Sequence, residues 1–305
     1  MSAFLCPYCG EHKSDGERSL EHPMPRALGG QGFSTRDVCG FCNERAGREV
    51  DRPFAEHFII HGLRHRYDIR DARGDVPPAP WLPGKDSDGG RILLELGKEP
   101  RTRRVPHKTR DDATGVTYLT ELGEGEALLE KLKVRAEKRA GPGYRVDANV
   151  ETVLASDKGT IPVSIPMTLW PRFMAKLALA FGREALGDNW ATSKDAEMLR
   201  TVLWNTPDAP ATHPLCEQTD EEGAFARVAP APAHLVLINP LNGGCGVIVQ
   251  LFGRLIYGCP LSETLTEPEH IAWTFDPVKG TARRTSLAEL IGAQSRPFSP
   301  KMWDV

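Results

Sequence analysis

Four cysteines near the start of the chain have the spacing of a metal site. Cys6 and Cys9 form one Cys-x-x-Cys pair, and Cys39 and Cys42 form a second. Each pair places two sulfur atoms on one tight turn, and two such turns facing each other complete a tetrahedron around Zn²⁺. The alternative is four buried thiols without a metal, which is less typical of two such pairs. We therefore predict a structural Zn²⁺ ion held by all four cysteines.

The segment between the two pairs carries an acidic residue next to a histidine. Glu21 and His22 are followed by two prolines and then by Gly29 and Gly30. Histidine is the side chain whose ordinary pKa lies nearest neutral pH, so it can take a proton from water. The zinc site would then act as a clamp that holds a His-bearing hairpin against the segment starting at Asn43.

A longer pattern links these residues to a known family. It consists of Cys-x-x-Cys, then Glu-His-x-x-Pro-x-Ala-Leu-Gly-Gly, then Cys-x-x-Cys-Asn, then Gly47 and Asp51. The pattern resembles the HNH endonucleases, also called ββα-metal or His-Me finger nucleases, and most of all the branch braced by a structural zinc ion. The resemblance is dense over residues 4–55. Residues 175–178 and 251–253 are loosely similar to the second half of some long members.

The resemblance implies hydrolysis of a phosphodiester bond, in which a divalent cation with oxygen ligands stabilises the charge that develops on the phosphate. It also implies a role for each polar residue of the motif. His22 matches the general base, Glu21 the acidic metal ligand, and Asn43 the third signature position, whose side-chain oxygen binds the metal. The metal would be Mg²⁺, with Mn²⁺ as a substitute, because both prefer oxygen ligands. Alternatives remain: Glu21 could point to solvent, Asn43 could only cap a helix, and His22 could be structural. Asp51 lies about two helical turns after Asn43 and could reach the metal or hold the helix in place.

The middle signature residue of the family is usually Asn, and here its position holds Asp37. In the family this residue orients the loop and the catalytic His through its backbone. Aspartate can accept the same hydrogen bonds but cannot donate them. The resemblance therefore assigns Asp37 to the site with a role that the residue type does not fully match.

The expected fold class is α+β: an N-terminal zinc-braced ββα finger followed by a mixed α+β region. A Pro- and Gly-rich break over residues 71–91 separates the finger from the remainder. We expect three parts, namely the nuclease finger (1–62), a linker with a basic α+β segment (63–150), and a C-terminal α+β domain of unknown role (151–305). Apolar spacing predicts helices over 43–60, 125–139, 170–186 and 195–204, with Pro53 interrupting the first or starting another. Alternating residues predict strands over 20–22, 91–96, 115–120, within 150–166, and over 234–239, 246–252 and 254–257.

The formal net charge of −3 over 305 residues does not by itself indicate a nucleic-acid partner. Positive residues would have to gather locally, as they do between Lys98 and Arg110. We expect contacts to double-stranded DNA from Arg26, Arg101, Arg103, Arg104 and Lys108, although such segments are usually solvated surfaces. His57, His61 and His65 recur at intervals of four, but ordinary histidines are a better interpretation than a second metal site. Cys216, Cys245 and Cys259 should pack as small apolar residues.

These observations favour a metal-dependent endonuclease that acts on DNA. One rival is a zinc-finger module that binds nucleic acid without cutting it. Another is a nuclease that the C-terminal region licenses, for example in phage defence. The cysteine spacing fits a reducing cytoplasm, and we expect neither a secretory signal nor a membrane span. The sequence leaves the oligomeric state open, a homodimer included.

Overall fold

The computed structural model describes residues 3–71, 73–86, 89–104, 107–110, 113, 117–120, 134, 138, 159–160, 168–204, 216–217, 228–241, 244–262 and 270–294. Contacts within the chain define two compact units. One combines residues 1–78 with 165–305, and the other spans residues 79–164. The three-part division expected from the sequence remains a prediction.

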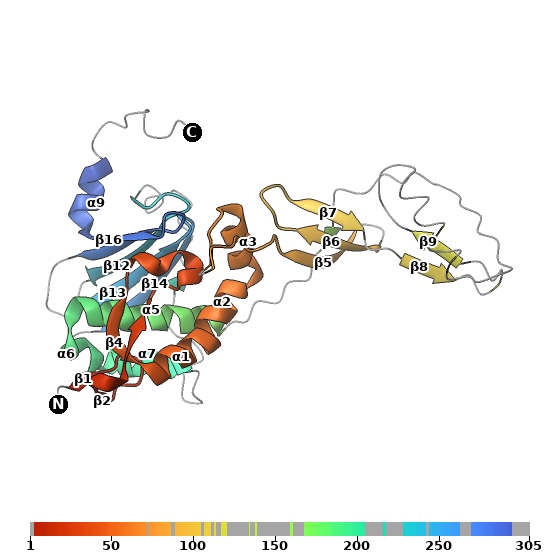
Figure 1. Ribbon diagram of the computed structural model, residues 1–305. Helices are drawn as coiled ribbons and strands as arrows, with labels where there is room; N and C mark the ends of the chain where they lie inside the picture. Colours follow the sequence, from red (N-terminus) through yellow and green to blue (C-terminus); the bar gives the residue numbers. More distant parts are fainter. Residues whose placement is uncertain are drawn as a thin grey trace. The chain divides into compact units, whose positions relative to one another are not determined.

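The N-terminal segment of the first unit folds as two short hairpins and a helix. Strand β1 (Ala3–Leu5) pairs with β2 (His12–Ser14), and β3 (Arg18–Glu21) pairs with β4 (Thr35–Cys39), both antiparallel. Helix α1 (Gly40–Ala46) follows β4 directly, which completes the predicted ββα arrangement (Figure 1). Three 3-10 helices lie beside the strands: η1 (Asp15–Glu17), η2 (Arg26–Leu28) and η3 (Gly30–Gly32).

The helical segment after α1 changes its geometry twice. A π-helical turn, η4 (Gly47–Asp51), leads into α2 (Arg52–Glu56), and α3 (Phe58–Arg66) follows. Pro53 sits in the first turn of α2, where its missing N–H is tolerated. This matches one of the two expectations for Pro53, namely that it starts another helix. The sharp break lies at His57, whose ψ of 132° is not helical. Ala46, Val50 and Phe54 recur at intervals of four and are buried, whereas Phe58, the next residue in this spacing, is half-buried.

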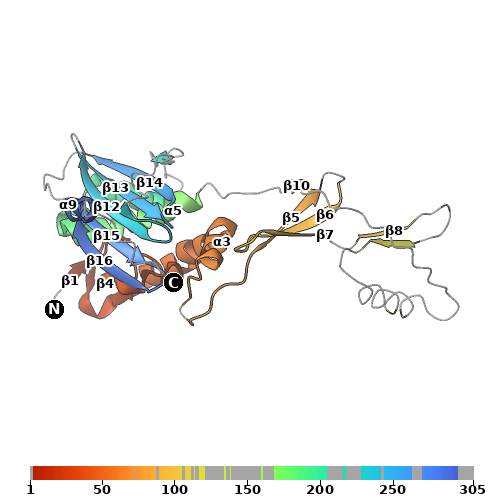
Figure 2. The ribbon, with the colours of Figure 1, turned by 90° about the horizontal axis from the view of Figure 1, so that it is seen from above.

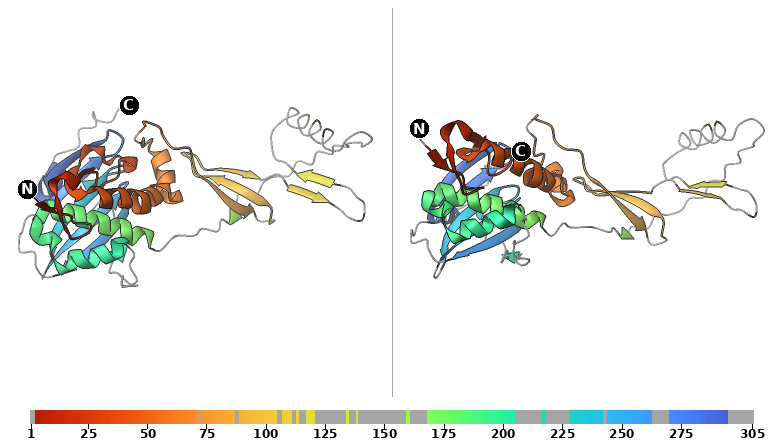
Figure 3. Two further views of the ribbon diagram at one scale, coloured as in Figure 1. Left: turned by 60° about the horizontal axis from the view of Figure 1, so that its bottom comes forward. Right: turned by 90° about the horizontal axis from the view of Figure 1, so that it is seen from below.

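The C-terminal part of this unit supplies three helices. They are α5 (Leu169–Leu186), α6 (Asp188–Ala191) and α7 (Lys194–Trp204), so the predictions for residues 170–186 and 195–204 are confirmed. Helix α5 is buried over most of its middle. It packs against α7, against α2 and η4 of the N-terminal segment, and against the large sheet. Figure 3 shows α5, in green, beside the orange-red N-terminal helices in both views.

The large sheet of the first unit is antiparallel, with the order β11-β14-β13-β12-β15-β16 (Figure 2). Its strands are β11 (Cys216–Glu217), β12 (His234–Leu241), β13 (Gly244–Leu251), β14 (Leu255–Ser262), β15 (Ile271–Asp276) and β16 (Thr281–Ser286), and α9 (Leu287–Gln294) follows. The predicted meander over residues 234–257 is confirmed, and its second turn contains Phe252 and Gly253. The molecule is therefore of the α+β class, with a ββα region ahead of helices and an antiparallel sheet.

Two contacts fix the loop after β3 against this sheet. Gly29 has a φ of +79°, and a Cβ atom there would lie 2.3 Å from the Cα of Pro277, which follows β15. The Nε2 of the fully buried His234, on β12, lies 2.9 Å from the carbonyl oxygen of Leu28. Because His234 also accepts the N–H of Phe252 at Nδ1, its proton is on Nε2 and it donates to Leu28. The loop that follows Glu21 and His22 is thus held by residues more than 200 positions away.

The second unit contains two small antiparallel sheets. One has the order β10-β5-β6-β7, from β10 (Gly159–Thr160), β5 (Trp81–Asp86), β6 (Arg91–Glu95) and β7 (Arg101–Arg104). The other pairs β8 (His107–Arg110) with β9 (Thr117–Thr120). The strands predicted at 91–96 and 115–120 are confirmed. Of the predicted helix over 125–139 only residues 134 and 138 are described, and both are helical. Most of the strands predicted within 150–166 lie outside the described residues.

None of the helices in the described part of the chain combines the length and the apolar character needed to cross a bilayer.

Candidate active site

The four cysteines of the motif converge as predicted. Their sulfur atoms all lie within 4.8 Å of one another, two from the turn after β1 and two from the junction of β4 and α1. A tetrahedral site with Zn–S bonds of about 2.3 Å needs sulfur atoms roughly 3.8 Å apart. The backbone N–H of Cys39 donates to the sulfur of Cys6 over 3.4 Å, as suits a thiolate. The cluster is consistent with a structural Zn²⁺ ion.

The three histidines at intervals of four do not form a second metal site. Among the described residues, only the four cysteines form a group of three or more His, Cys, Asp or Glu side chains that could share an ion. The rings of His61 and His65 instead contact the carbonyl oxygens of Pro78 and Pro77. His57 is buried against Phe58 and Trp170.

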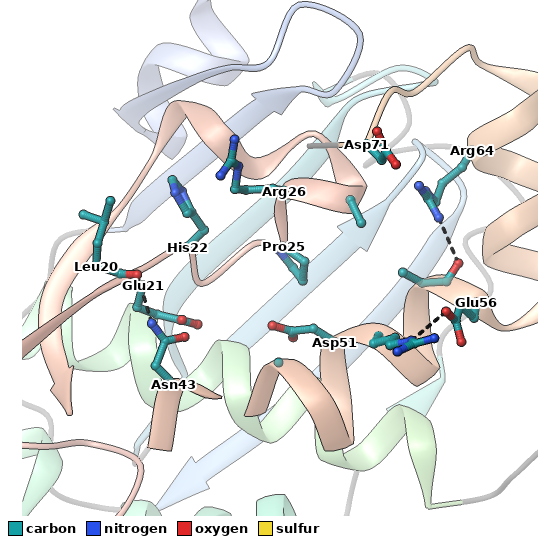
Figure 4. Close-up of a pocket in the computed structure, with 14 residues that line it drawn as sticks. Leu20, Glu21, His22, Pro25, Arg26, Asn43, Asp51, Glu56, Arg64 and Asp71 are labelled. Atoms are coloured by element: carbon teal, nitrogen blue, oxygen red, sulfur yellow. Dashed lines mark hydrogen bonds and ion pairs between the residues drawn. The ribbon is translucent and has the colours of Figure 1, made fainter. Parts of the chain in front are cut away.

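A pocket of about 410 Å³ opens beside the end of β3. It brings together most of the residues that the motif singled out, from β3, the loop after it, α1 and η4 (Figure 4). Its lining consists of Leu20, Glu21, His22, Pro25, Arg26, Ala27, Asn43, Gly47, Asp51, Arg52, Ala55, Glu56, Arg64 and Asp71.

His22 presents one unprotonated ring nitrogen. Its Nδ1 lies 3.1 Å from the carbonyl oxygen of Phe33, and a carbonyl can only accept a hydrogen bond. The proton of the neutral ring is therefore on Nδ1, and Nε2 carries a lone pair. The ring of Phe33 stacks on Phe181 of α5, with centroids 5.4 Å apart, so that the residue holding His22 is itself fixed by the core.

Asn43 is oriented by the strand beside it. Its Nδ2 donates to the hydroxyl of Ser19 over 2.8 Å and to the carbonyl oxygen of Leu20 over 2.9 Å. The Leu20 carbonyl can only accept, so the contacting atom must be the amide nitrogen. The side-chain oxygen of Asn43 is then available to the pocket (Figure 4). Asn43 joins α1 to β3 rather than capping its own helix.

The carboxylates of Glu21 and Asp51 share one buried ammonium group. The Nζ of Lys176, on α5, lies 2.8 Å from Glu21 and 2.7 Å from Asp51, and its side chain is 0% exposed. It also donates to the carbonyl oxygen of Pro23 over 3.2 Å. The hydroxyl of Tyr8 donates to the same Glu21 oxygen over 3.1 Å. A helix from the second half of the chain therefore positions both acidic residues of the motif.

This arrangement shifts the pKa of Lys176, Asp51 and Tyr8. Burial alone would lower the pKa of Lys176, but the charges of Asp51 and Glu21 raise it above its ordinary value. Burial raises the pKa of Asp51 to about 6, the ammonium of Lys176 opposes this shift, and Glu21 adds to it. Burial and the neighbouring Glu21 also raise the pKa of Tyr8 well above its ordinary range. Lys176 stays charged and keeps the two carboxylates together.

The remaining expected site residues are Asp37 and the basic residues predicted to contact DNA. The carboxylate of Asp37 pairs with Arg18 over 3.0 Å, and the carbonyl that contacts His22 belongs to Phe33. Arg26 is exposed at the pocket edge. Arg101, Arg103 and Arg104 lie on β7 and Lys108 on β8, in the other unit. No finding tests the roles assigned to these residues, so all of them stay predictions.

Lys176 and Phe33 belong to the site but were not predicted from the sequence to take part in it. One signal for Lys176 was present: a single lysine within the apolar run of α5 must either be exposed or find buried anions. Phe33 acts through its main chain, which every residue possesses. Its role in orienting His22 therefore cannot be predicted from the residue type.

The fold and pocket together define a zinc-braced ββα domain with a histidine and oxygen ligands at one site. Residues 6–59 match the family model described as HNH endonuclease. The chain thus carries an HNH endonuclease domain at residues 6–59, with a four-cysteine cluster. No curated protein and no solved structure matches the chain. The family match indicates a nuclease, and hence a phosphodiesterase with a nucleic-acid partner.

Proposed function

We propose that the protein is a metal-dependent endonuclease that hydrolyses phosphodiester bonds in double-stranded DNA. The observation that carries this proposal is the free Nε2 of His22 in the same pocket as the oxygen of Asn43 and the carboxylates of Asp51 and Glu21. A base and a set of hard oxygen ligands are the two components that such hydrolysis requires.

His22 acts as the general base. Its Nε2 takes a proton from water as the water oxygen forms a bond to phosphorus, and the bond from phosphorus to the 3′ oxygen breaks. The hydrogen bond from Nδ1 to Phe33 keeps the ring in place and stabilises the positive charge that the ring acquires. The direction of this hydrogen bond selects the tautomer that the reaction needs.

Asn43, Asp51 and Glu21 would hold the divalent cation. Their side-chain oxygens come from three elements and line one pocket, and oxygen ligands suit Mg²⁺ or Mn²⁺. When bound, the cation acts as a Lewis acid on the phosphate oxygens and the leaving oxygen. Lys176 already donates to both oxygens of Asp51 and offsets part of the negative charge of the two carboxylates. Phosphate and water would supply the remaining ligands.

The first test compares nicking of supercoiled plasmid by the wild type and by His22→Ala, with Mg²⁺ or Mn²⁺ added. Loss of a general base should lower the rate by roughly 100-fold or more. The matched control is His12→Ala, which removes an exposed histidine on β2 outside the pocket and should cut normally. Zinc content must be equal in all three proteins. Equal cutting by His22→Ala and the wild type would refute the assignment, and wild type that binds DNA without cutting would favour the binding module.

A further inference from the structure

Arg64 is a buried arginine of the same pocket that the proposed reaction does not use. It lies on α3 and is 6% exposed. Figure 4 shows it at the end of the pocket away from His22 and Asn43, with Asp51 and Pro25 between. A guanidinium group stays charged in proteins, so this position places a fixed positive charge in the wall of the pocket.

The hydrogen-bonding capacity of Arg64 is largely unused. Its Nη1 donates to the carbonyl oxygen of Ala55 over 3.3 Å, while Nε is buried without a partner. Within the described part of the chain no carboxylate forms an ion pair with it, and Asp71 and Glu56 act on it only through space. Burial lowers the pKa of Arg64, and the charges of Asp71 and Glu56 only partly oppose this shift.

The other positively charged residues in or next to the pocket either pair with carboxylates or are exposed. Lys176 has two carboxylates, and Arg52 pairs with Glu56 over 2.8 Å. Arg26 reaches solvent. A buried charge without a counter-ion is costly, and the group that can supply one to Arg64 must enter through the pocket. Arginine's planar fork matches phosphate oxygens well.

We propose that Arg64 binds a phosphate group of the nucleic acid next to the one that is cleaved. This inference rests on the proposed function, because it takes the attacked phosphate to lie beside His22 and Asn43. Arg64 lies at the opposite end of the pocket, and every nucleotide of a strand that crosses the pocket brings another phosphate. The bound group is either an internal phosphate or the terminal phosphate of a short strand. The contact fixes the register of the strand relative to His22 Nε2.

The first experiment measures binding of a fluorescent duplex by anisotropy at several salt concentrations, without added divalent metal so that no DNA is cut. Arg64→Gln should weaken binding at least tenfold and reduce the slope of log K against log salt by about 1. The matched control is Arg66→Gln, which removes the same charge from an exposed position of the same helix. It should change affinity less than threefold. Equal affinities for the two variants would overturn the inference.

A second experiment begins with the wild type alone. The cleavage position of a duplex that the wild type cuts is mapped, and the phosphates that flank it are replaced one at a time by uncharged methylphosphonate. One internal replacement should slow cutting by the wild type and have little further effect on Arg64→Gln, or on the equally uncharged Arg64→Met if the glutamine variant fails to fold. A terminal phosphate as the true ligand would show its effect only when the 5′ phosphate is removed.

The failures of the two proposals are distinguishable. If no flanking or terminal phosphate matters while the wild type still cuts, the Arg64 inference is wrong and the nuclease stands. If the wild type binds DNA and never cuts it, the nuclease proposal is wrong, while the anisotropy comparison of Arg64→Gln with Arg66→Gln still decides whether Arg64 binds phosphate.

Discussion

The finger contains two clusters of acidic groups, the four thiols and the carboxylates of Glu21 and Asp51. Within each cluster the ionised groups repel one another, and the two clusters differ in how that repulsion is offset. The four thiols come from two short turns, and their sulfur atoms lie within 4.8 Å of one another. The carboxylates of Glu21 and Asp51 meet around the ammonium of Lys176, which is supplied by a distant helix. If the thiol cluster holds the proposed Zn²⁺ ion, its stability depends on a metal from solution. The carboxylate cluster carries an internal cation, so under the proposed function it needs a metal only for chemistry.

The largest effect should follow from removing the zinc ligands. Cys42→Ser, or a strong chelator, should unfold the finger and abolish cutting, because binding of a structural Zn²⁺ contributes on the order of 10 kcal/mol to the folding of such domains. Circular dichroism and metal content check this outcome. Removing Mg²⁺ should abolish cutting and leave the unfolding temperature nearly unchanged. If the chelated protein keeps its unfolding temperature, the thiol cluster does not need a metal for stability and the prediction is wrong.

A smaller but still severe effect is expected for Lys176→Met. It leaves two buried carboxylates without their counter-ion, and breaking a buried ion pair in this way costs about 3–5 kcal/mol. Added Mg²⁺ should restore more stability to this variant than to the wild type, because the ion can replace the missing charge. Denaturant unfolding measures both effects. Lys194→Met, at an exposed position of α7, is the control.

The hydrogen bond from His234 on β12 to the carbonyl oxygen of Leu28, in the loop after His22, should make the stability depend on pH. Burial lowers the pKa of His234 to about 4, against an ordinary value of 6.5, with the Leu28 carbonyl partly opposing the shift. Between these two values the unfolded chain binds the proton more readily than the folded one, so stability falls as the pH falls from 6.5 to 4. The loss attributable to His234 is about 3 kcal/mol at the low end.

His234→Gln should therefore show a smaller loss of unfolding free energy between pH 7 and pH 4 than the wild type. The comparison is made on the slope with pH, because the variant is also expected to be less stable at neutral pH. Identical slopes for the two proteins would mean that His234 is not held neutral by the fold.

The smallest effect is expected for Asp37→Asn. Its partly exposed pair with Arg18 contributes about 0.5 kcal/mol, and the His22 contact comes from Phe33 instead. Cutting should change less than threefold in the plasmid assay. A loss of 100-fold or more would restore the middle signature role to Asp37.

The features that the sequence predicted are those carried by spacing along the chain. Two Cys-x-x-Cys pairs bring their sulfur atoms together locally, and a Glu-His step at a strand end is recognisable as a motif. The helix of residues 170–186 and the meander over 234–257 followed from apolar periodicity. Such patterns depend on residues close in sequence, so they can be recognised without knowing the contacts between distant segments.

The features that the sequence did not predict depend on contacts between distant segments or on main-chain atoms. Lys176 reaches Asp51 across 125 positions, and His234 reaches Leu28 across 206. In neither pair does the spacing along the chain predict that the two residues meet. The carbonyl of Phe33 is chemically the same as every other carbonyl, so only the bulged β3–β4 hairpin reveals that it faces His22.

The position of Lys176 along the chain also sets an order of events during synthesis. Asp51 leaves the ribosome 125 residues before the lysine that neutralises it. At roughly 5–20 residues per second, this gap corresponds to about 6–25 seconds. During that interval a nascent finger can bring its four cysteines together, yet the carboxylates of Glu21 and Asp51 lack their ammonium and the loop after β3 lacks the sheet that holds it. A chain released early, before α5, would carry the whole recognisable motif without a finished active site.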